Sequence, residues 1–176
     1  IHKKYIYLHS HYAKIRYICH MRRLLQLLLT CLLAIHVYGQ QTVIYNDDIA
    51  TVTIYRDNDW RTLPVIPLHG DAKIIVNFDQ YGHNYQQYQY KIEHCEADWS
   101  VSKDLFPTDV ADGFLEDLDI KDVEKSVNTN ILYTHYSFRV PNEQVNLKLS
   151  GNYKVTVYRA YSPEEIAFEG YFMVLD

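Results

Sequence analysis

The sequence is poor in the residues that cross-links and metal sites need. It contains three cysteines in 176 residues, and two of them, Cys19 and Cys31, lie within the first 39. Cys95 is alone in the rest of the chain, so no disulfide can form there. No two cysteines or histidines have the CxxC or HxxxH spacing of a zinc site. We therefore expect a domain without disulfide, metal or cofactor, stabilised by its own hydrophobic core.

Long hydrophobic runs are also missing. The apolar run from Leu24 to Val37 has 14 residues, whereas a membrane-spanning helix needs about 20. It follows Met21 and two arginines and ends just before Gly39. This order of basic, apolar and small residues is typical of a secretory signal peptide. We predict that residues 21–39 are such a peptide and that the protein is exported.

Residues 1–20 show no pattern typical of a domain or of a targeting signal. They are basic and aromatic, and they precede the first methionine, Met21. We interpret them as a spurious upstream extension. The predicted working part is then residues 40–176, whose 137 residues are enough for one domain with a buried core.

Positive charge is scarce in this predicted domain. Six of the 17 Lys and Arg lie before Gly39, whereas all 22 Asp and Glu lie beyond Asn46. The remaining 11 bases and 22 acids give residues 40–176 a net charge of −11. Nucleic acids and anionic membrane surfaces repel such a domain, so we expect neither as a partner.

Helical periodicity is absent over any stretch longer than about three turns. Short runs rich in β-branched and aromatic residues alternate instead with turn residues. The strands expected from these runs are 51–56, 62–68, 72–79, 86–95, 130–140, 145–150, 153–161 and 167–175. Closely spaced strands with few helices predict an antiparallel β-sandwich.

One local motif indicates which kind of sandwich. In "SGNYKVTVY" a turn containing Gly151 is followed at once by Tyr153 and an alternating strand. This is the arrangement of a tyrosine corner, in which the hydroxyl bonds back to the preceding turn. Val155 stands where an antibody domain has its second cysteine. We therefore predict an immunoglobulin-like all-β sandwich whose sheets are joined by apolar packing.

Residues 96–127 interrupt the run of strands with ten acids between Glu96 and Glu124. We expect one long acidic loop here, with a possible short helix within residues 112–126. A loop this long in a compact β domain is often a binding surface. A solvated acidic excursion without a role remains the alternative.

The stretch "YQYKIEHCEADWS" resembles an active site in composition, because His94, Cys95 and several acids stand together. Successive side chains of a strand point to opposite faces, so His94 and Cys95 diverge. A reactive thiol needs a low pKa and a base, which His94 or His135 would have to supply, whereas acidic surroundings raise a thiol pKa. We interpret the stretch as structural and expect no catalytic residue.

Six pieces of the sequence, in this order, resemble a known family: "FDQ…YQYKIEHCEADW", "DGF", "SVNT", "YTHYSF", "PNE" and "LSGNYKVTVY…FMV". They are similar to the first domain of the type IX secretion system plug protein family of Bacteroidota, over about residues 43–176. The resemblance implies a non-enzymatic periplasmic protein that seals the outer-membrane translocon barrel in the absence of cargo. Because proteins of that family are longer, it also implies that residues 40–176 are a first domain with a C-terminal part missing.

The resemblance leaves the contact surface open. We expect it on loops at one end of the sandwich or on residues 96–127, with Trp99, Phe106 and Phe114 as candidate partner-binding residues, because buried aromatics dominate many interfaces. The same side chains would serve equally well in the domain's own core. An exported glycan-binding or adhesive sandwich is the alternative function.

Overall fold

The computed structural model describes residues 21–28, 42–57 and 59–176. The predicted upstream extension, residues 1–20, lies outside this range, as do residues 29–39 of the predicted signal peptide. Gln40–Asp176 forms one compact unit, and the fold described below belongs to it.

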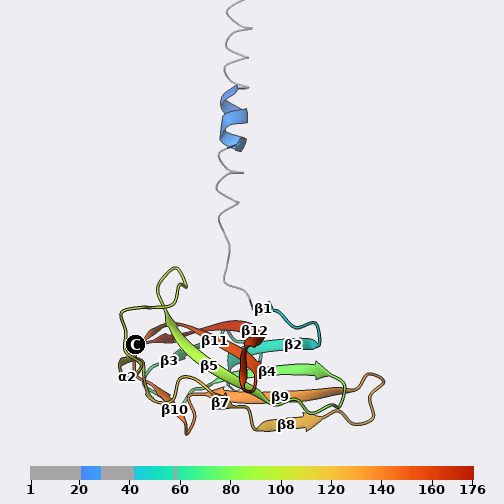
Figure 1. The fold of residues 1–176 in the computed structure, drawn as a ribbon. Helices are drawn as coiled ribbons and strands as arrows, with labels where there is room; N and C mark the ends of the chain where they lie inside the picture. The colour runs from blue at the N-terminus through green and yellow to red at the C-terminus, as the bar shows by residue number, and fades with distance from the viewer. Residues whose placement is uncertain (1–20, 29–41, 58) are drawn as a thin grey trace, which may run out of the picture. The chain divides into compact units, whose positions relative to one another are not determined.

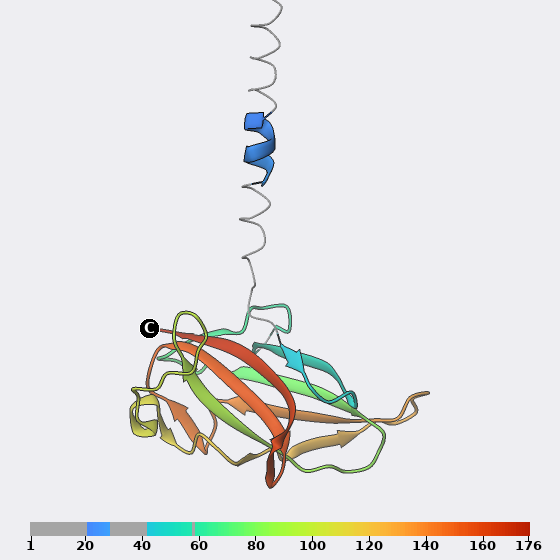
Figure 2. The same ribbon diagram turned by 45° about the horizontal axis from the view of Figure 1, so that its top comes forward.

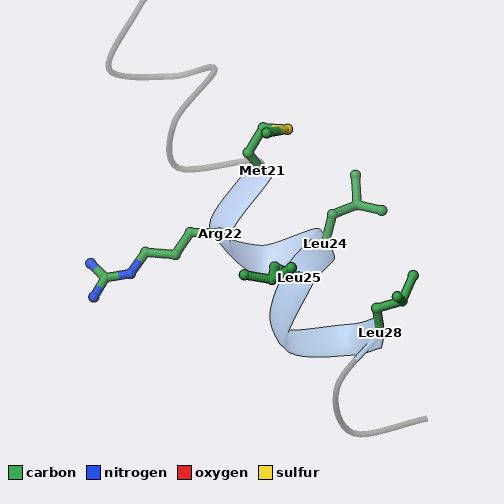
Figure 3. A pocket seen from close by; sticks show the side chains of 5 residues that line it. All are labelled: Met21, Arg22, Leu24, Leu25 and Leu28. Atoms are coloured by element: carbon green, nitrogen blue, oxygen red, sulfur yellow. The ribbon is translucent and has the colours of Figure 1, made fainter. Parts of the chain in front are cut away.

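Residues 21–28 form a short helix with exposed side chains. Figure 3 shows Met21, Leu24 and Leu28 on one side of this helix and Arg22 on the other. Within the described parts of the chain, no helix is long and apolar enough to cross a membrane. The signal peptide remains a prediction.

Two β-sheets form the body of the domain (Figures 1 and 2). The first has the spatial order β1 (Val43–Ile44), β12 (Ser162–Leu175), β11 (Gly151–Arg159), β5 (Tyr88–Cys95) and β7 (Leu118–Asp119), with β3 (Val65–Pro67) beside the end of β12. The second has the order β2 (Ile49–Arg56), β4 (Ile74–Tyr81), β9 (Tyr133–Val140) and β8 (Asp122–Lys125). A small ribbon pairs β10 (Val145–Leu147) with β6 (Ala111–Gly113).

The architecture confirms the predicted all-β sandwich, and each of the eight expected strands overlaps an observed one. One pairing differs from the antiparallel expectation, because β3 runs parallel to the end of β12. β3 is a short edge strand that is far from β12 in the sequence, so no hairpin joins the two strands and they can run in parallel.

Aromatic rings fill the space between the two sheets. Phe78 stacks on Tyr136 with ring centres 4.9 Å apart, and Tyr88 meets both rings edge-on at 5.3 and 5.2 Å. Tyr90 stacks on Phe138 of the opposite sheet at 4.1 Å. Such pairs contribute about 0.5–1.5 kcal/mol each beyond the area they bury. The tyrosines expected to face a half-buried sheet thus supply much of the core.

The outer face of β11 is more covered than a two-layer sandwich predicts. Thr156, which alternates with core valines, is 1% exposed. Lys154 on the same face lies 3.1 Å from Glu93 of β5 and 3.3 Å from Glu169 of β12. These neighbouring strands crowd the face with long charged side chains, which shield Thr156 from water.

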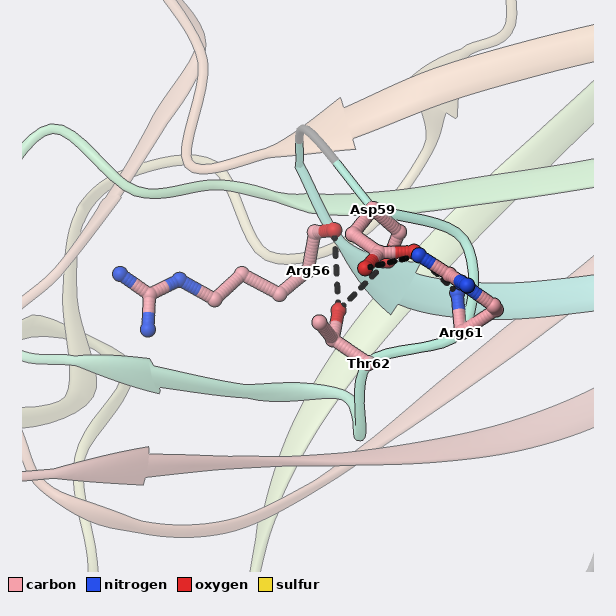
Figure 4. A network of polar contacts seen from close by, with 4 residues as sticks. All are labelled: Arg56, Asp59, Arg61 and Thr62. Carbon is pink, nitrogen blue, oxygen red and sulfur yellow. Dashed lines mark hydrogen bonds and ion pairs between the residues drawn. The ribbon is translucent and has the colours of Figure 1, made fainter.

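The β2–β3 connection is closed by local polar contacts (Figure 4). The Thr62 hydroxyl donates to the carbonyl oxygens of Asp59 at 2.7 Å and Arg56 at 3.2 Å. Arg61 Nε donates to the Asp59 carboxylate at 3.1 Å. Because this ion pair is exposed to solvent, we assign it a role in shaping the turn and no function.

The turn before β11 has the geometry expected around a tyrosine corner. The Tyr153 hydroxyl donates to the carbonyl oxygen of Leu149 at 2.6 Å, and Tyr153 is fully buried. Gly151 has φ +148°, and a Cβ there would collide with the His94 ring. The sequence at this corner therefore has little freedom to change.

Replacing Tyr153 with Phe tests the energetic role proposed for this corner. Tyr153→Phe should lower the free energy of unfolding by about 1 kcal/mol, because the Leu149 carbonyl loses its donor. Tyr161→Phe is the matched control, since its side chain is 82% exposed. Urea denaturation of both variants measures the effect, and equal midpoints for the two would argue against the corner.

Residues 96–127 are not one loop with a helix inside residues 112–126. The only α-helix among them is α2 (Pro107–Val110), and β6, β7 and β8 follow it. Pro107 starts the helix, as proline often does, because its missing N–H has no partner at that position anyway. The three strands have two to four residues each, which is too short for alternation to show in the sequence.

Candidate functional site

A groove of about 500 Å³ lies between the C-terminal half of β5 and the chain that follows it. Its apolar lining comes from β5, α2 and the residues around them: Ile92, Val101, Leu105, Pro107, Val110, Phe114 and Leu115. Glu93, Glu116 and Asp117 add carboxylates to the same lining. The groove is therefore suited to an apolar segment with a basic or polar margin.

Two phenylalanines of this region are unusually exposed. Phe106 is 72% and Phe114 71% exposed, although phenylalanine is among the residues most often buried. Phe114 lines the groove, and Phe106 lies between two lining residues, Leu105 and Pro107. The domain's own core therefore does not use these two side chains, and their predicted role as aromatic anchors stays a prediction.

Backbone hydrogen bonds fix both phenylalanines in place. The Asp109 carboxylate accepts from the Phe106 N–H at 3.2 Å, and the Asp109 N–H donates to the Phe106 carbonyl at 2.9 Å. The Phe114 N–H donates to the carbonyl oxygen of Gln144 at 2.9 Å. An anchor whose backbone is already ordered loses less entropy on binding than one in a flexible loop.

Trp99 lies elsewhere. It is half-buried and occupies a turn in which the Glu96 N–H donates to the Ser100 carbonyl and the Trp99 N–H donates to the Glu96 carbonyl. Its ring meets Tyr171 of β12 edge-on, with centres 5.4 Å apart. Trp99 is not part of the groove lining, whereas Phe114 is, and Phe106 is the neighbour in sequence of two lining residues. For all three, partner binding stays a proposal.

Acidic side chains line part of the groove and are frequent in the segment that forms its wall. Of the ten acids predicted to make this segment acidic, all but Asp119 are exposed. One of them, Asp112, pairs with Lys148 at 3.2 Å. Lys148 Nζ also donates to the carbonyl oxygen of Thr108 at 2.9 Å, which ties β10 to α2. The exposed carboxylates create a negative potential that would attract a basic partner surface.

The side chains of His94 and Cys95 have separate surroundings. The His94 ring packs edge-on against the core residue Tyr153 at 5.2 Å, and His94 Nδ1 lies 2.8 Å from the Ser102 hydroxyl. Cys95 is 2% exposed, and its Sγ lies 3.8 Å from the carbonyl oxygen of Glu93. His135 belongs to the other sheet, where its Nδ1 lies 2.7 Å from the Asp79 carboxylate.

Burial is the main reason that the pKa of the Cys95 thiol is raised. Glu93 and Glu96 raise this pKa further, while Lys154 lowers it. The predicted direction is correct, but desolvation contributes more than the acidic surroundings that the sequence emphasised. The thiol stays protonated at neutral pH, which removes its nucleophilicity.

The Cys95 thiol should therefore resist alkylation in the folded protein. We expect iodoacetamide to react at least roughly tenfold more slowly with native protein than with protein in urea, because the reagent needs an accessible thiolate. Mass spectrometry of timed samples measures both rates. Native labelling as fast as denatured labelling would contradict the buried, protonated thiol.

Within the described residues, no group of three or more His, Cys, Asp or Glu is placed to hold a metal ion. The groove was missed by sequence reasoning, because its apolar wall combines Ile92 of β5 with residues up to 23 positions later. One sequence signal pointed to an exposed aromatic residue beside the groove. In "DGF" a turn glycine, Gly113 with φ +103°, directly precedes the exposed Phe114.

Known proteins resemble this chain in sequence and in structure. A sequence profile of the family described as type 9 secretion system plug protein, first domain, matches residues 49–176. The structure is similar to a crystal structure of a hypothetical protein from Parabacteroides merdae, with a TM-score of 0.73 and 34% identity. That match covers 78% of this chain and 34% of the other chain, so this chain spans about one third of that protein. No curated protein matches the sequence.

Proposed function

Because this chain belongs to the family of the type 9 secretion system plug protein first domain, we propose that it docks on the outer-membrane translocon barrel and helps to seal it when cargo is absent. It is a protein associated with type IX secretion, from a family that is not one of enzymes. The proposed docking surface is the groove with its exposed Phe106 and Phe114. The predicted signal peptide supports a periplasmic location for this role.

The observation that carries the docking proposal is the exposure of these two phenylalanines beside an apolar groove. Protein interfaces typically have an apolar centre with aromatic anchors, surrounded by a polar rim. Phe106 and Phe114, with the groove lining, supply the centre, and the exposed acids supply the rim. Basic residues on the translocon would then speed association and set its orientation.

Removing both anchors should weaken docking without unfolding the domain. In the Phe106→Ala, Phe114→Ala double variant we expect roughly a thousandfold loss of affinity, since two aromatic anchors at about 2 kcal/mol each contribute about 4 kcal/mol together. Both side chains are more than 70% exposed, so the unfolding midpoint should change little. Tyr85→Ala with Tyr161→Ala is the matched control, because both tyrosines are exposed and lie outside the groove.

The function itself is tested by affinity purification from a host that has this secretion system. The tagged 176-residue chain should co-purify with a large outer-membrane barrel, identified by mass spectrometry, and the double variant should recover much less of it. Recovery of the tagged protein alone, at matched expression, would contradict the docking role. Saturable binding of a soluble glycan in its place would favour the adhesive alternative.

A further inference from the structure

A second hollow, of about 530 Å³, lies at the other end of β5 from the groove. It is formed by the turn between β1 and β2, the ends of β4 and β11, and the starts of β5 and β12. Unlike the groove, its lining is mostly polar and contains the acids Asp47, Asp48 and Glu165. Nothing in the docking role proposed above uses these residues.

Tyr88 at the start of β5 lines this hollow with a buried ring and an unpartnered hydroxyl. The residue is 2% exposed, and its ring packs edge-on against both Phe78 and Tyr136. The hydroxyl makes no hydrogen bond within the described residues, whereas Tyr136, Tyr153 and Tyr158 all do. The hydroxyl oxygen is not sealed off from solvent, so it opens into the hollow, where water or a ligand can supply its hydrogen bond.

The charges nearest to the Tyr88 hydroxyl belong to the same hollow. Burial is the main cause of its raised pKa, Tyr136 and Asp48 raise that pKa further, and Arg159 lowers it. Asp48 and Arg159 both line the hollow, which places the hydroxyl at its wall. The Asp48 turn is ordered, because its N–H donates to Asn46 Oδ1 and its carbonyl accepts from the Tyr81 N–H, each at 2.9 Å.

The hollow carries a net negative charge. Its single arginine, Arg159, lies 3.1 Å from Glu165, so these two charges neutralise each other. Asp47 and Asp48 remain, and within the described residues neither carboxylate has an ion pair or a hydrogen-bond donor to its side chain. The lining thus offers two carboxylates and the phenol oxygen of Tyr88 as acceptors.

We propose that this hollow binds a guanidinium group, such as an arginine side chain of a partner protein. A guanidinium carries its positive charge on several N–H donors in a planar fork. It can donate at once to the Asp48 carboxylate and to the Tyr88 phenol oxygen, with the Gln86 side-chain amide oxygen as a further acceptor at the wall. An anion would be repelled by Asp47 and Asp48.

Titration of the ¹⁵N-labelled 176-residue chain with N-acetyl-arginine methylamide tests this site. Its neutral isostere, N-acetyl-citrulline methylamide, has the same shape without the charge. We expect saturable amide shifts around residues 47–48 and 86–88, at least roughly tenfold weaker binding of the citrulline probe, and weaker binding at higher salt.

Three variants separate the site from general attraction to an acidic protein. Asp48→Asn should weaken arginine binding by roughly tenfold. Tyr88→Phe should weaken it several-fold while leaving the unfolding midpoint unchanged, because the hydroxyl has no protein partner to lose. Asp122→Asn on β8 removes an exposed acid outside the hollow and should leave the affinity unchanged.

The inference is overturned if the two probes shift the same amides equally, if no saturation occurs, or if Asp122→Asn weakens binding as much as Asp48→Asn. Saturation of these amides by a neutral sugar such as maltotriose, with no response to arginine, would overturn it as well. None of these outcomes depends on the translocon, so the docking proposal is tested separately.

Discussion

The domain should unfold between about pH 10 and pH 12, because it buries several tyrosines as neutral phenols. Burial raises the pKa of Tyr88, Tyr90 and Tyr153, and it raises the pKa of Tyr158 to about 12. All four side chains are at most 2% exposed. An unfolded tyrosine, in contrast, ionises near pH 10.

The sign of the effect follows from the protons bound in each state. Above about pH 10 the unfolded chain has released these protons while the folded domain still holds them, so stability falls as pH rises. Each such tyrosine lowers the free energy of unfolding by about 1.4 kcal/mol per pH unit until its folded pKa is reached. Below about pH 10 both states are protonated, and these tyrosines cause no pH dependence.

Urea denaturation at a series of pH values, followed by circular dichroism, measures this slope. Tyr153→Phe should reduce the slope of the free energy of unfolding against pH by the contribution of one proton, because one buried phenol is removed. Tyrosinate absorbance should rise together with the loss of structure for the buried tyrosines. Ionisation of all tyrosines near pH 10 in a domain that remains folded would contradict their burial.

Gly113→Ala should be among the most destabilising single substitutions in the domain. Gly113 has φ +103°, a region that L-residues avoid, and an added Cβ would collide with the backbone carbonyl of Gln144. The strained backbone costs about 1–3 kcal/mol, and displacement of β6 from β10 adds to it. We therefore expect Gly113→Ala to lower the free energy of unfolding by about 3 kcal/mol or more in total.

Gly82→Ala is the matched control for this prediction. Gly82 has φ +90°, but no atom lies within 4 Å of the position that its Cβ would occupy. Gly82→Ala should therefore lower the free energy of unfolding only through backbone strain, by about 1–2 kcal/mol. Chemical denaturation of the two variants separates strain from collision, and equal losses would show that the β6–β10 contact is unimportant. Gly113→Ala should also weaken docking, because Phe114 follows directly.

The six longest strands of the two sheets, β2, β4, β5, β9, β11 and β12, were predictable because each is long enough for alternation or β-branched composition to show. The family, too, was recognisable from the order of six short motifs, and the profile match over residues 49–176 confirms it. Tyr153 could be located from a turn glycine two residues before it. These are all local signals, carried by neighbouring residues.

The groove and the hollow were not predictable for the opposite reason. Each combines residues that are far apart in the sequence, such as Ile92 with Leu115 and Asp48 with Tyr88. Thr156 alternates like a solvent-facing residue, yet the charged side chains of two neighbouring strands cover it. Burial of this kind depends on which strands become neighbours in the sheet, and local sequence patterns do not reveal which strands pair.

The central claim, that the groove beside Phe114 faces the translocon, is tested most directly by site-specific cross-linking in a host with this secretion system. A photo-reactive phenylalanine analogue would replace Phe114 or, as a control, the exposed Thr53 of β2. The account predicts a light-dependent adduct with the outer-membrane barrel from position 114 and none from position 53. An adduct from position 53 alone, or none from either at matched expression, would contradict it.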